Sequence, residues 1–533
     1  MFSPNPAAAR IAHNRTSVVA ELTFSELIGI VVPMTRWWGD LPPHLRNFDR
    51  ARQSLVDKQV TFASSAEVEF FTFAATAGLL GLLLKSTNDD EAERLAKAMI
   101  EARGVTPEIM PLLEEYQQLA QYFEYSSPPD GAAIGRVQLN RRASLSVRQS
   151  RQTIKADASY NLFRGSAAKL KWAVIDCGID ARHPGFAPPP PAPGAAPAVA
   201  PAGAAFVSRV VTTYDFTGVR DLLSGSATHD AAGRPIEPAL VAALKTLNDA
   251  GRQVDWSLVK DAVTIPHVPG LYKAPTADHG THVAGIIGAN WERDPDGKPV
   301  IGICPDIGLV DVRVFDGAEA DEFNVIAALQ FISYLNRSSE VLEIPGVNIS
   351  FSFAHDVRNY ACGRTPICNE CEKLIDNGVV VVTAAGNAGY RQAEVVPTLA
   401  DRYATMSITD PGNAPSVITV GSTHRTQPHT YGVSFFSSRG PTGDGRAKPD
   451  ILAPGEKILS TTLNDKSGEK DGTSMAAPHV SGAAAILMTR NAELIGKPRM
   501  IKDILCRSAT DLGREKSFQG AGIVDVLRAL QSL

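Results

Sequence analysis

Asp471–Met488 reads DGTSMAAPHVSGAAAILM, and this stretch gives the strongest indication of the fold. A Gly-Thr-Ser turn leads into small and apolar residues, with no Asp, Glu, Lys or Arg until Arg490. This pattern predicts a buried helix whose first turn presents Ser474 at a surface, where unpaired N–H groups and the helix dipole favour a developing negative charge. Pro478 falls in or just beyond that first turn, where a missing N–H costs little. Because an ordinary N-cap serine has the same local pattern, other stretches must decide between the two interpretations.

Length and composition place the chain among ordinary globular proteins. With 533 residues it is long enough for a large core and for two domains. A hydrophobic content of 44% and a charged content of 20% fit a soluble protein. The formal net charge of −5 gives no indication of nucleic acid or an anionic membrane as a partner. Six cysteines in a chain of this size do not make a disulfide scaffold.

The N-terminal stretch lacks the pattern of a secretory signal, because Glu21 and Glu26 interrupt its most apolar part. Phe70–Leu84, FFTFAATAGLLGLLL, is the one stretch apolar enough to suggest a membrane span. It is shorter than the roughly 20 residues that cross a bilayer, and it lies between Glu69 and Lys85, so a buried core helix is the better interpretation. We therefore expect no membrane partner and a cytoplasmic location.

Three regions follow one another along the chain. Residues 1–128 have mainly helical patterns and no metal, nucleotide or nucleophile signature, so we expect an additional helical domain with a regulatory, inhibitory or partner-binding role. A turn-rich stretch and six basic residues between Arg136 and Lys155 predict a solvated basic linker over residues 129–160. Residues 161–533 form the third region, with an insertion at about 187–275 that begins with a Pro/Ala-rich tract.

Short apolar runs alternate with helical patterns in the third region. Leu170–Asp176, LKWAVID, is a predicted buried strand that ends in a carboxylate, and His279–Gly288 is a predicted helix rich in small residues. Further strands are expected at Gly308–Phe315, Val347–Phe353, Val379–Ala384 and Val417–Val420, and further helices at Ile236–Asp249, Trp256–Val263, Asn324–Asn336, Cys368–Asn377 and Met500–Ala509. This alternation predicts an α/β fold with a mostly parallel sheet covered on both faces, and active sites in such folds lie at the carboxyl ends of the strands.

Three side chains belong to elements that meet at that edge. Asp176 closes a strand, while His279 and Ser474 each begin a helix. Acyl transfer requires this set, because an imidazole must remove the hydroxyl proton, and a buried carboxylate must fix the imidazole tautomer and stabilise its cation. Asn387, in TAAGNAG after a β-branched strand, can donate its side-chain N–H to an oxyanion that forms at Ser474, beside the backbone N–H of Ser474.

The same stretches resemble the signatures of the subtilisin-like serine proteases, the subtilases of peptidase family S8. The resemblance covers roughly residues 160–533 and implies a subtilisin-like, three-layer, doubly wound sheet. It also implies a serine endopeptidase that acts on protein or peptide substrates through an acyl-enzyme. Four segments carry it in the family's order: VIDCGID at Val174–Asp180, HGTHVAGIIGA at His279–Ala289, AAGN at Ala384–Asn387 and GTSMAAPHVSG at Gly472–Gly482.

Under this resemblance the four reactive residues take separate roles, and no cofactor enters the chemistry. Ser474 is the nucleophile and His279 is the general base and then the acid. Asp176 orients the imidazole, and Asn387 is an oxyanion donor. An inactive protease fold used only for binding is disfavoured, because all four residues are present. A lipase or esterase of the α/β-hydrolase type is disfavoured too, because no G-x-S-x-G elbow surrounds Ser474.

The resemblance also implies residues that bind substrate. Asn348–Ser352 is expected to be an edge strand that pairs with an extended peptide, with an interior strand as the alternative. The primary specificity pocket is expected between two short segments: Ser350, Phe351, Ser352 and Ala384, Ala385, Gly386. Many family members have glycine where Ser352 stands, which predicts a narrower or more polar pocket here.

The chain departs from the family at His183-Pro184-Gly185. Many subtilases read His-Pro-Asp there, and the aspartate is a calcium ligand. A hard cation needs several oxygen ligands, so Gly185 in its place predicts that this calcium site is lost. Glycine at this one position does not exclude a structural calcium site elsewhere in the chain.

Four cysteines invite more than one interpretation. Cys362, Cys368 and Cys371 form a C-x5-C-x2-C cluster, which fits a zinc site, a disulfide with one free thiol, or three reduced thiols. The spacing is weak evidence for zinc, so we predict no metal site and favour reduced thiols. Cys177 directly follows Asp176, either as a small buried residue or as a thiol whose oxidation would disturb the triad.

Two parts of the chain have no counterpart in compact subtilases. The insertion at about 187–275 must emerge near the active-site edge, and we hypothesise that it shapes substrate access. Secreted subtilases carry a small α+β propeptide, which the helical N-terminal region does not resemble. We therefore hypothesise that a regulatory protein partner acts through that region.

Overall fold

The computed structural model describes residues 150–163, 165–188, 206–292, 299–317, 319–391 and 402–533, together with residues 294, 295 and 297 and short stretches before residue 150. The Pro/Ala-rich tract lies almost wholly outside the described residues. The chain divides into two compact units: a first unit of Met1–Ala9 and Ala20–Leu139, and a second unit of Arg10–Val19 and Asn140–Leu533.

The first unit has two described helical stretches, 72–78 and 112–116. Phe70, Leu112 and Tyr116 are fully buried, and the rings of Phe70 and Tyr116 meet edge to face with 6.3 Å between their centroids. Among the described residues, no helix has the length and hydropathy that a membrane span requires. Most of residues 1–128 lies outside the described part, so the helical N-terminal domain stays a prediction.

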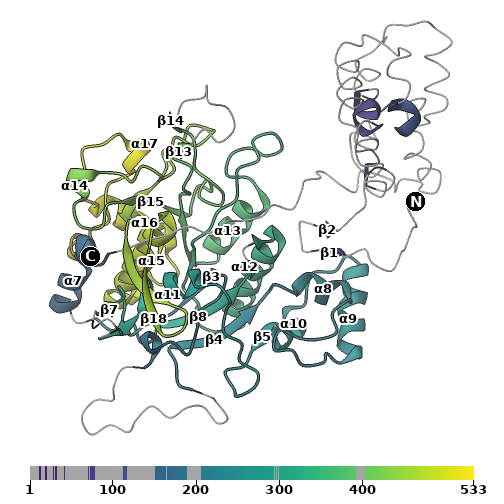
Figure 1. Cartoon of the computed structure of the whole chain (residues 1–533), viewed down its shortest axis with the longest axis horizontal. Helices are drawn as coiled ribbons and strands as arrows, with labels where there is room; N and C mark the ends of the chain where they lie inside the picture. Colours follow the sequence, from purple (N-terminus) through teal and green to yellow (C-terminus); the bar gives the residue numbers. More distant parts are fainter. Residues whose placement is uncertain are drawn as a thin grey trace, which may run out of the picture. The chain divides into compact units, whose positions relative to one another are not determined.

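An eight-stranded sheet forms the centre of the second unit (Figure 1), with the order β16-β15-β12-β11-β3-β8-β4-β5. All neighbouring strands are parallel except β4 and β5, which pair antiparallel. The strands are β3 Lys171–Asp176, β4 Val210–Asp215, β5 Thr264–Ile265, β8 Gly308–Arg313, β11 Gly346–Ile349, β12 Val380–Ala384, β15 Ile418–Thr423 and β16 Ile451–Pro454.

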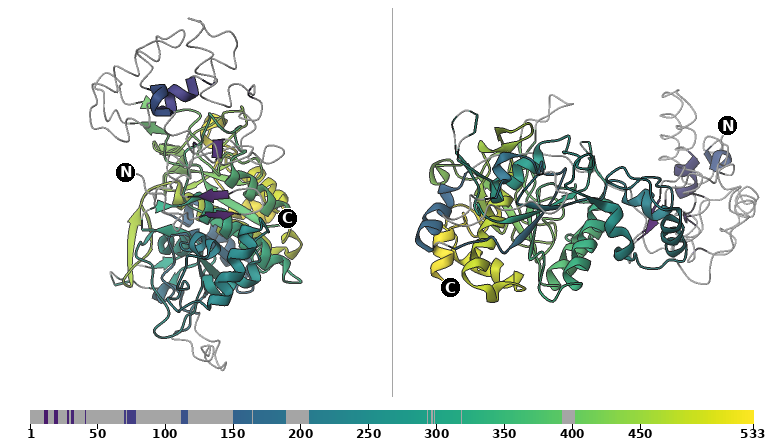
Figure 2. Two further views of the ribbon diagram at one scale, coloured as in Figure 1. Left: turned by 90° about the vertical axis from the view of Figure 1, so that its right-hand side faces the viewer. Right: turned by 90° about the horizontal axis from the view of Figure 1, so that it is seen from below.

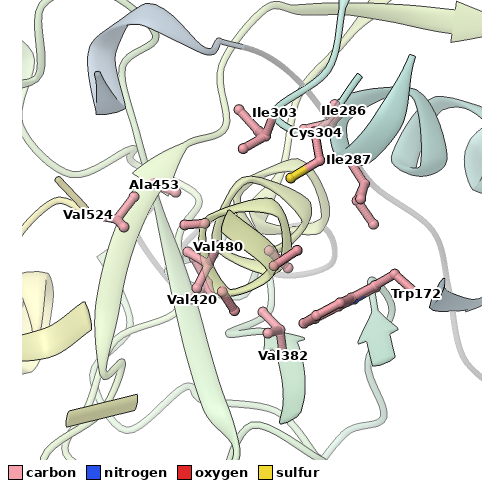
Figure 3. Close-up of a cluster of buried hydrophobic side chains, with 14 of the residues drawn as sticks. Trp172, Ile286, Ile287, Ile303, Cys304, Val382, Val420, Ala453, Val480 and Val524 are labelled. Carbon is pink, nitrogen blue, oxygen red and sulfur yellow. The ribbon is translucent and has the colours of Figure 1, made fainter. Parts of the chain in front are cut away.

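Helices cover both faces of this sheet. Alternate residues of a strand point to opposite sides, so each face of the sheet has apolar side chains that the helices bury. Trp172 and Val174 of β3 join one core with the helices around α15, while Ala173 and Ile175 join a second core with α12 and α13. Figure 3 shows the first core closing around α15. The second unit is therefore a three-layer α/β fold, as the sequence predicts. The longer helices are α7 Ala156–Phe163, α9 Pro238–Asp249, α10 Trp256–Val263, α11 His279–Gly288, α12 Glu322–Arg337, α13 Pro366–Asp376, α15 Thr473–Arg490 and α16 Pro498–Ser508.

Short elements complete the second unit. Helices α16 and α18, near the end of the chain and coloured toward yellow in Figure 2, pack beside α15. The remaining strands and α-helices that the structure describes are β1 Ile11–His13, β2 Val18–Ala20, α8 Val219–Ser224, β6 Asn290–Trp291, β7 Val300–Ile301, β9 Phe315–Asp316, β10 Glu319–Ala320, β13 Tyr390–Arg391, β14 Arg402–Tyr403, α14 Pro428–Tyr431, β17 Ile458–Thr462, β18 Lys466–Lys470, α17 Lys516–Gln519 and α18 Val526–Gln531.

The structure corrects the edge-strand prediction for Asn348–Ser352. Strand β11 ends at Ile349 and is hydrogen-bonded to β3 on one side and β12 on the other. All four residues of β11 are buried, as expected of a strand that is covered on both faces. Ser350 and its neighbours lie beyond the carboxyl end of this interior strand.

The segment 150–156 belongs to the predicted linker, but in the structure it is an integral part of the second unit. The side chains of Ile154 and Ala156 are fully buried in the core around α15. The backbone N–H of Ser150 donates to Nε2 of His479 at 2.9 Å, and Lys155 forms an ion pair with Asp525. We call residues 150–156 the N-terminal strap.

Candidate active site

Asp176 and His279 form a buried hydrogen-bonded pair. Asp176 is the last residue of β3 and His279 the first of α11, and their exposed fractions are 0% and 2%. Nδ1 of His279 lies 2.8 Å from Oδ1 and 3.0 Å from Oδ2 of Asp176. The backbone N–H of Cys177 donates to the same Oδ1 at 2.8 Å, which helps to fix the carboxylate. Because Nδ1 of His279 faces Asp176, Nε2 points away from the carboxylate and is the nitrogen that can act as the base.

Ser474 is the second residue of α15, in the turn where backbone N–H groups have no helical partner. Helix α15 packs against α11 and against the strands β11, β12 and β15. The carbonyl of Ser474 accepts a hydrogen bond from the hydroxyl of Ser350 at 2.6 Å. Because Ser350 follows Ile349, which pairs with Ile175 in register, this bond ties Ser474 to the sheet edge at which Asp176 ends.

Pro478 explains why that carbonyl needs a partner. The sequence analysis places Pro478 near the first turn, but it is the sixth residue of α15, well inside the helix. A residue at 478 with an N–H would donate to the carbonyl of Ser474, and proline cannot. The Ser350 hydroxyl takes this role, and it accepts in turn from Nδ2 of Asn348 at 2.8 Å. The prediction that the proline costs little because of its position is therefore wrong; a buried serine compensates for it.

Asn387 lies in the loop after β12, and Thr473 fixes its orientation. Oδ1 of Asn387 accepts from the backbone N–H of Thr473 at 2.9 Å and from its hydroxyl at 3.1 Å. The Thr473 hydroxyl accepts in turn from the backbone N–H of Gly386 at 3.1 Å. The amide oxygen of Asn387 is therefore held by the residue that precedes Ser474, which fixes the plane of the amide. The sequence alone did not reveal this clamp.

The residues predicted to bind substrate lie at the ends of β11 and β12, at the same edge. Phe351 packs edge to face against Phe315 and Phe353, and Ser350 is used inside the protein as described. Only Ser352 among the six is partly exposed; Ser350, Phe351, Ala384, Ala385 and Gly386 are buried. Their contact with substrate stays a prediction.

Cys177 lies between Asp176 and the first turn of α11. Its sulfur accepts from the backbone N–H of Gly280 at 3.2 Å. Burial, together with the nearby charge of Asp176, raises the pKa of the Cys177 thiol well above its usual range, so this cysteine is not an activated thiolate. All six cysteines are free, which excludes the disulfide alternative for Cys362, Cys368 and Cys371. Within the described residues no group of three His, Cys, Asp or Glu side chains is arranged to hold a metal ion.

Gly185, at the position of the expected calcium ligand, is surrounded by protein atoms. A Cβ at this glycine would lie 2.7 Å from Cγ2 of Thr461. The carbonyl of Gly185 accepts from Nη2 of Arg209 at 2.8 Å, and the carbonyls of Ala187 and Ile307 accept from Nε and Nη1 at 3.1 Å each. A buried guanidinium therefore supplies positive charge to these backbone oxygens.

The alignments with known relatives cover about half of this chain. Subtilisin E of Bacillus subtilis is 29% identical over 259 residues, which cover 48% of this chain and 56% of subtilisin E. The major intracellular serine protease of B. subtilis is 31% identical over 253 residues, which cover 46% of this chain and 67% of that protein. Serine protease AprX of B. subtilis is 30% identical over 273 residues, which cover 46% of this chain and 56% of AprX. The chain thus spans little more than half the length of some of these proteins.

The match to the family as a whole is longer than the match to any of these relatives. The model of the subtilase family covers residues 168–523, which include every residue of the site described above and most of the chain. The matched region contains the aspartate, histidine, asparagine and serine segments in the family's order, and these segments lie at the ends of β3, α11, β12 and α15. The chain belongs to the subtilase family of serine proteases.

Proposed function

We propose that this chain is a serine endopeptidase that hydrolyses peptide bonds in protein or peptide substrates. The observation that carries the proposal is the buried Asp176–His279 pair at the edge where Ser474 begins α15. His279 takes the proton of Ser474 as the hydroxyl attacks the substrate carbonyl, and Asp176 stabilises the resulting imidazolium. The imidazolium then protonates the leaving amine, and water hydrolyses the acyl-enzyme by the same steps.

The oxyanion of the tetrahedral intermediate is assigned to two donors. The backbone N–H of Ser474 lies in the first turn of α15, and the second donor is the amide N–H of Asn387, whose orientation Thr473 fixes through the amide oxygen. Donors held before the reaction cost no reorganisation when the negative charge develops. We propose that Ser350, Phe351, Ser352, Ala384, Ala385 and Gly386 form the pocket for the substrate side chain, mainly through their backbone.

Labelling with a fluorophosphonate tests the activity directly. The wild-type chain should be labelled and should release peptides from casein, and Ser474→Ala should do neither. Ser481→Ala is a matched control, because Ser481 lies on the same helix and its hydroxyl bonds only to Asn348, at 2.9 Å. Labelling that persists in Ser474→Ala, or is absent from a folded wild-type chain, would contradict the proposal.

Three further proposals accompany this function. The chemistry needs no cofactor, and the Arg209 contacts support the absence of a calcium ion at Gly185; a melting temperature that falls in EDTA would then report a calcium ion elsewhere in the chain. The region before residue 129 regulates the protease or binds a regulatory partner, and intact masses of wild-type and Ser474→Ala chains would show whether it is removed autocatalytically.

The protein is intracellular; its free thiols and its similarity to a major intracellular serine protease support this, and cell fractionation would test it.

A further inference from the structure

The turn that follows Asp176 is held by side chains from outside the triad. Oδ1 of Asp311, on β8, accepts from the backbone N–H of Ile179 at 3.0 Å. The phenol of Tyr272 accepts from the backbone N–H of Ala181 at 2.7 Å and donates to the carbonyl of Ile179 at 3.1 Å. These three bonds satisfy both backbone groups of Ile179 and the N–H of Ala181. The turn is therefore fixed by a strand on one side and by the predicted insertion, which contains Tyr272, on the other.

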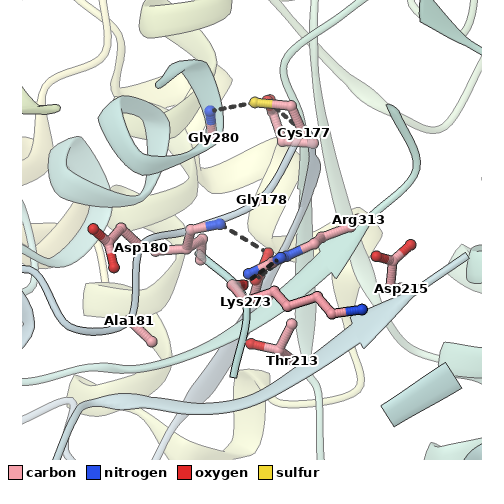
Figure 4. A network of polar contacts seen from close by, with 12 residues as sticks. Cys177, Gly178, Asp180, Ala181, Thr213, Asp215, Lys273, Gly280 and Arg313 are labelled. Atoms are coloured by element: carbon pink, nitrogen blue, oxygen red, sulfur yellow. Dashed lines mark hydrogen bonds and ion pairs between the residues drawn. The ribbon is translucent and has the colours of Figure 1, made fainter. Parts of the chain in front are cut away.

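Arg313 joins these two sides. Its Nε donates to Oδ2 of Asp311 at 2.9 Å, and its Nη1 donates to the carbonyl of Lys273, next to Tyr272, at 2.8 Å. Figure 4 shows Arg313 reaching from its strand toward Lys273 and the turn at Gly178. Asp311 is fully buried; burial raises its pKa to about 6, and the charge of Arg313 opposes the rise. The pair and the phenol together make one buried connection, which we call the Tyr272–Arg313 brace.

The brace is packed against the Asp176–His279 pair with little free space. Arg313 is paired in register with Asp176, and the N–H of Val314 donates to the carbonyl of Asp176 at 3.0 Å. Gly178 has φ +119°, and a Cβ there would lie 2.8 Å from Nε of Arg313. A Cβ on Gly280, beside His279, would lie 2.5 Å from the carbonyl oxygen of Gly178. A shift of the turn would therefore move the carboxylate and the first turn of α11 together.

We infer that Tyr272 and Arg313 are positioning residues that hold the Asp176 carboxylate in the plane and at the distance that His279 requires. Neither side chain contacts the reacting atoms, and both act by fixing the turn from Cys177 to Ala181. The inference rests on the proposed function and deepens it. It gives the region between Asp176 and His279 a part in positioning the catalytic pair, because that region supplies Tyr272 and the carbonyl of Lys273.

Tyr272→Phe tests the inference, because it removes the two phenol bonds and keeps the ring. We expect kcat, referred to active sites titrated with a fluorophosphonate, to fall by about tenfold or more, with KM within about twofold. A less well oriented carboxylate stabilises the imidazolium less, so the acid limb of kcat/KM should move to lower pH. Trp256→Phe is the matched control: Trp256 packs against Phe216 and Phe331 in the same region, and its loss should lower the melting temperature without moving the limb.

The outcomes separate this inference from the function on which it rests. A wild-type chain that is not labelled contradicts the proposed function. A labelled wild type, with a Tyr272→Phe variant of unchanged kcat and unchanged acid limb, overturns only the brace. If Tyr272→Phe yields no folded protein, Arg313→Lys replaces it, because lysine keeps the positive charge beside Asp311 but has no second arm for the Lys273 carbonyl. An Arg313→Lys variant with wild-type kcat and acid limb would equally overturn the inference.

Discussion

Ser350→Ala should destabilise the second unit mainly through the helix that carries Ser474. The substitution leaves two buried groups without their partner: the carbonyl of Ser474 and one N–H of the Asn348 amide. Each unsatisfied buried polar group costs about 1–3 kcal/mol, so the free energy of unfolding should fall by about 2–6 kcal/mol. A serine that served only to contact substrate would have almost no effect on stability.

A double-mutant cycle with Pro478→Ala isolates the bond to the carbonyl. Alanine at position 478 restores the N–H that proline lacks, and the helix can then satisfy the Ser474 carbonyl by itself. In this background Ser350→Ala should cost only the share that belongs to Asn348, about 1–3 kcal/mol, which gives a coupling of about 1–3 kcal/mol for the Ser474 carbonyl.

Urea unfolding of chains that also carry Ser474→Ala provides the assay. That substitution prevents self-digestion and leaves the main-chain carbonyl in place. Ser352→Ala is the matched control, because Ser352 lies two residues further on and is partly exposed. Equal costs of Ser350→Ala in the proline and alanine backgrounds would refute the idea that the serine compensates for the proline.

Three further predictions concern catalysis and stability. Asn387→Ala should lower kcat by about a hundredfold or more with little change in KM, by analogy with the loss of an oxyanion donor in a subtilisin, and a wild-type kcat would remove Asn387 from the mechanism. Burial lowers the pKa of His479 from 6.5 to about 4, so the unfolded chain binds more protons between these values, and the free energy of unfolding should fall by about 3 kcal/mol as pH drops from 6.5 to 4. Unfolding measured across this range should show a shallower slope in His479→Gln but not in His429→Gln, whose histidine is exposed; equal slopes would contradict the assignment. Arg209→Met should lower the free energy of unfolding by about 3 kcal/mol or more, because three carbonyls lose their donor, whereas Arg234→Met at the surface should change it by less than about 1 kcal/mol in the same thermal scan.

Local patterns were enough to predict the sheet, its helices and the placement of Asp176 and His279 at neighbouring element ends, where they form a hydrogen-bonded pair; the approach of Ser474 to His279 stays a prediction. Such patterns reflect the burial and the periodicity of residues within one element. The observed bounds of α10 and α11 are accordingly the bounds predicted from the sequence. The edge assignment of Asn348–Ser352 failed because the order of strands depends on contacts between segments far apart in sequence. The Ser350 bond, the Thr473 clamp and the Tyr272–Arg313 brace escaped prediction for the same reason, since each joins residues that no spacing rule connects.

The N-terminal strap sets a limit on how far this protein can be shortened. A polypeptide that began at residue 161, where the sequence alone would place the start of the protease, would lack Ile154 and Ala156 from its core and would leave Asp525 without its ion-pair partner Lys155. It would also lose the backbone donor to His479 on the helix of the nucleophile. A recombinant protease of minimal size should therefore begin before Ser150, and any physiological cut that spares activity should fall on the N-terminal side of that residue.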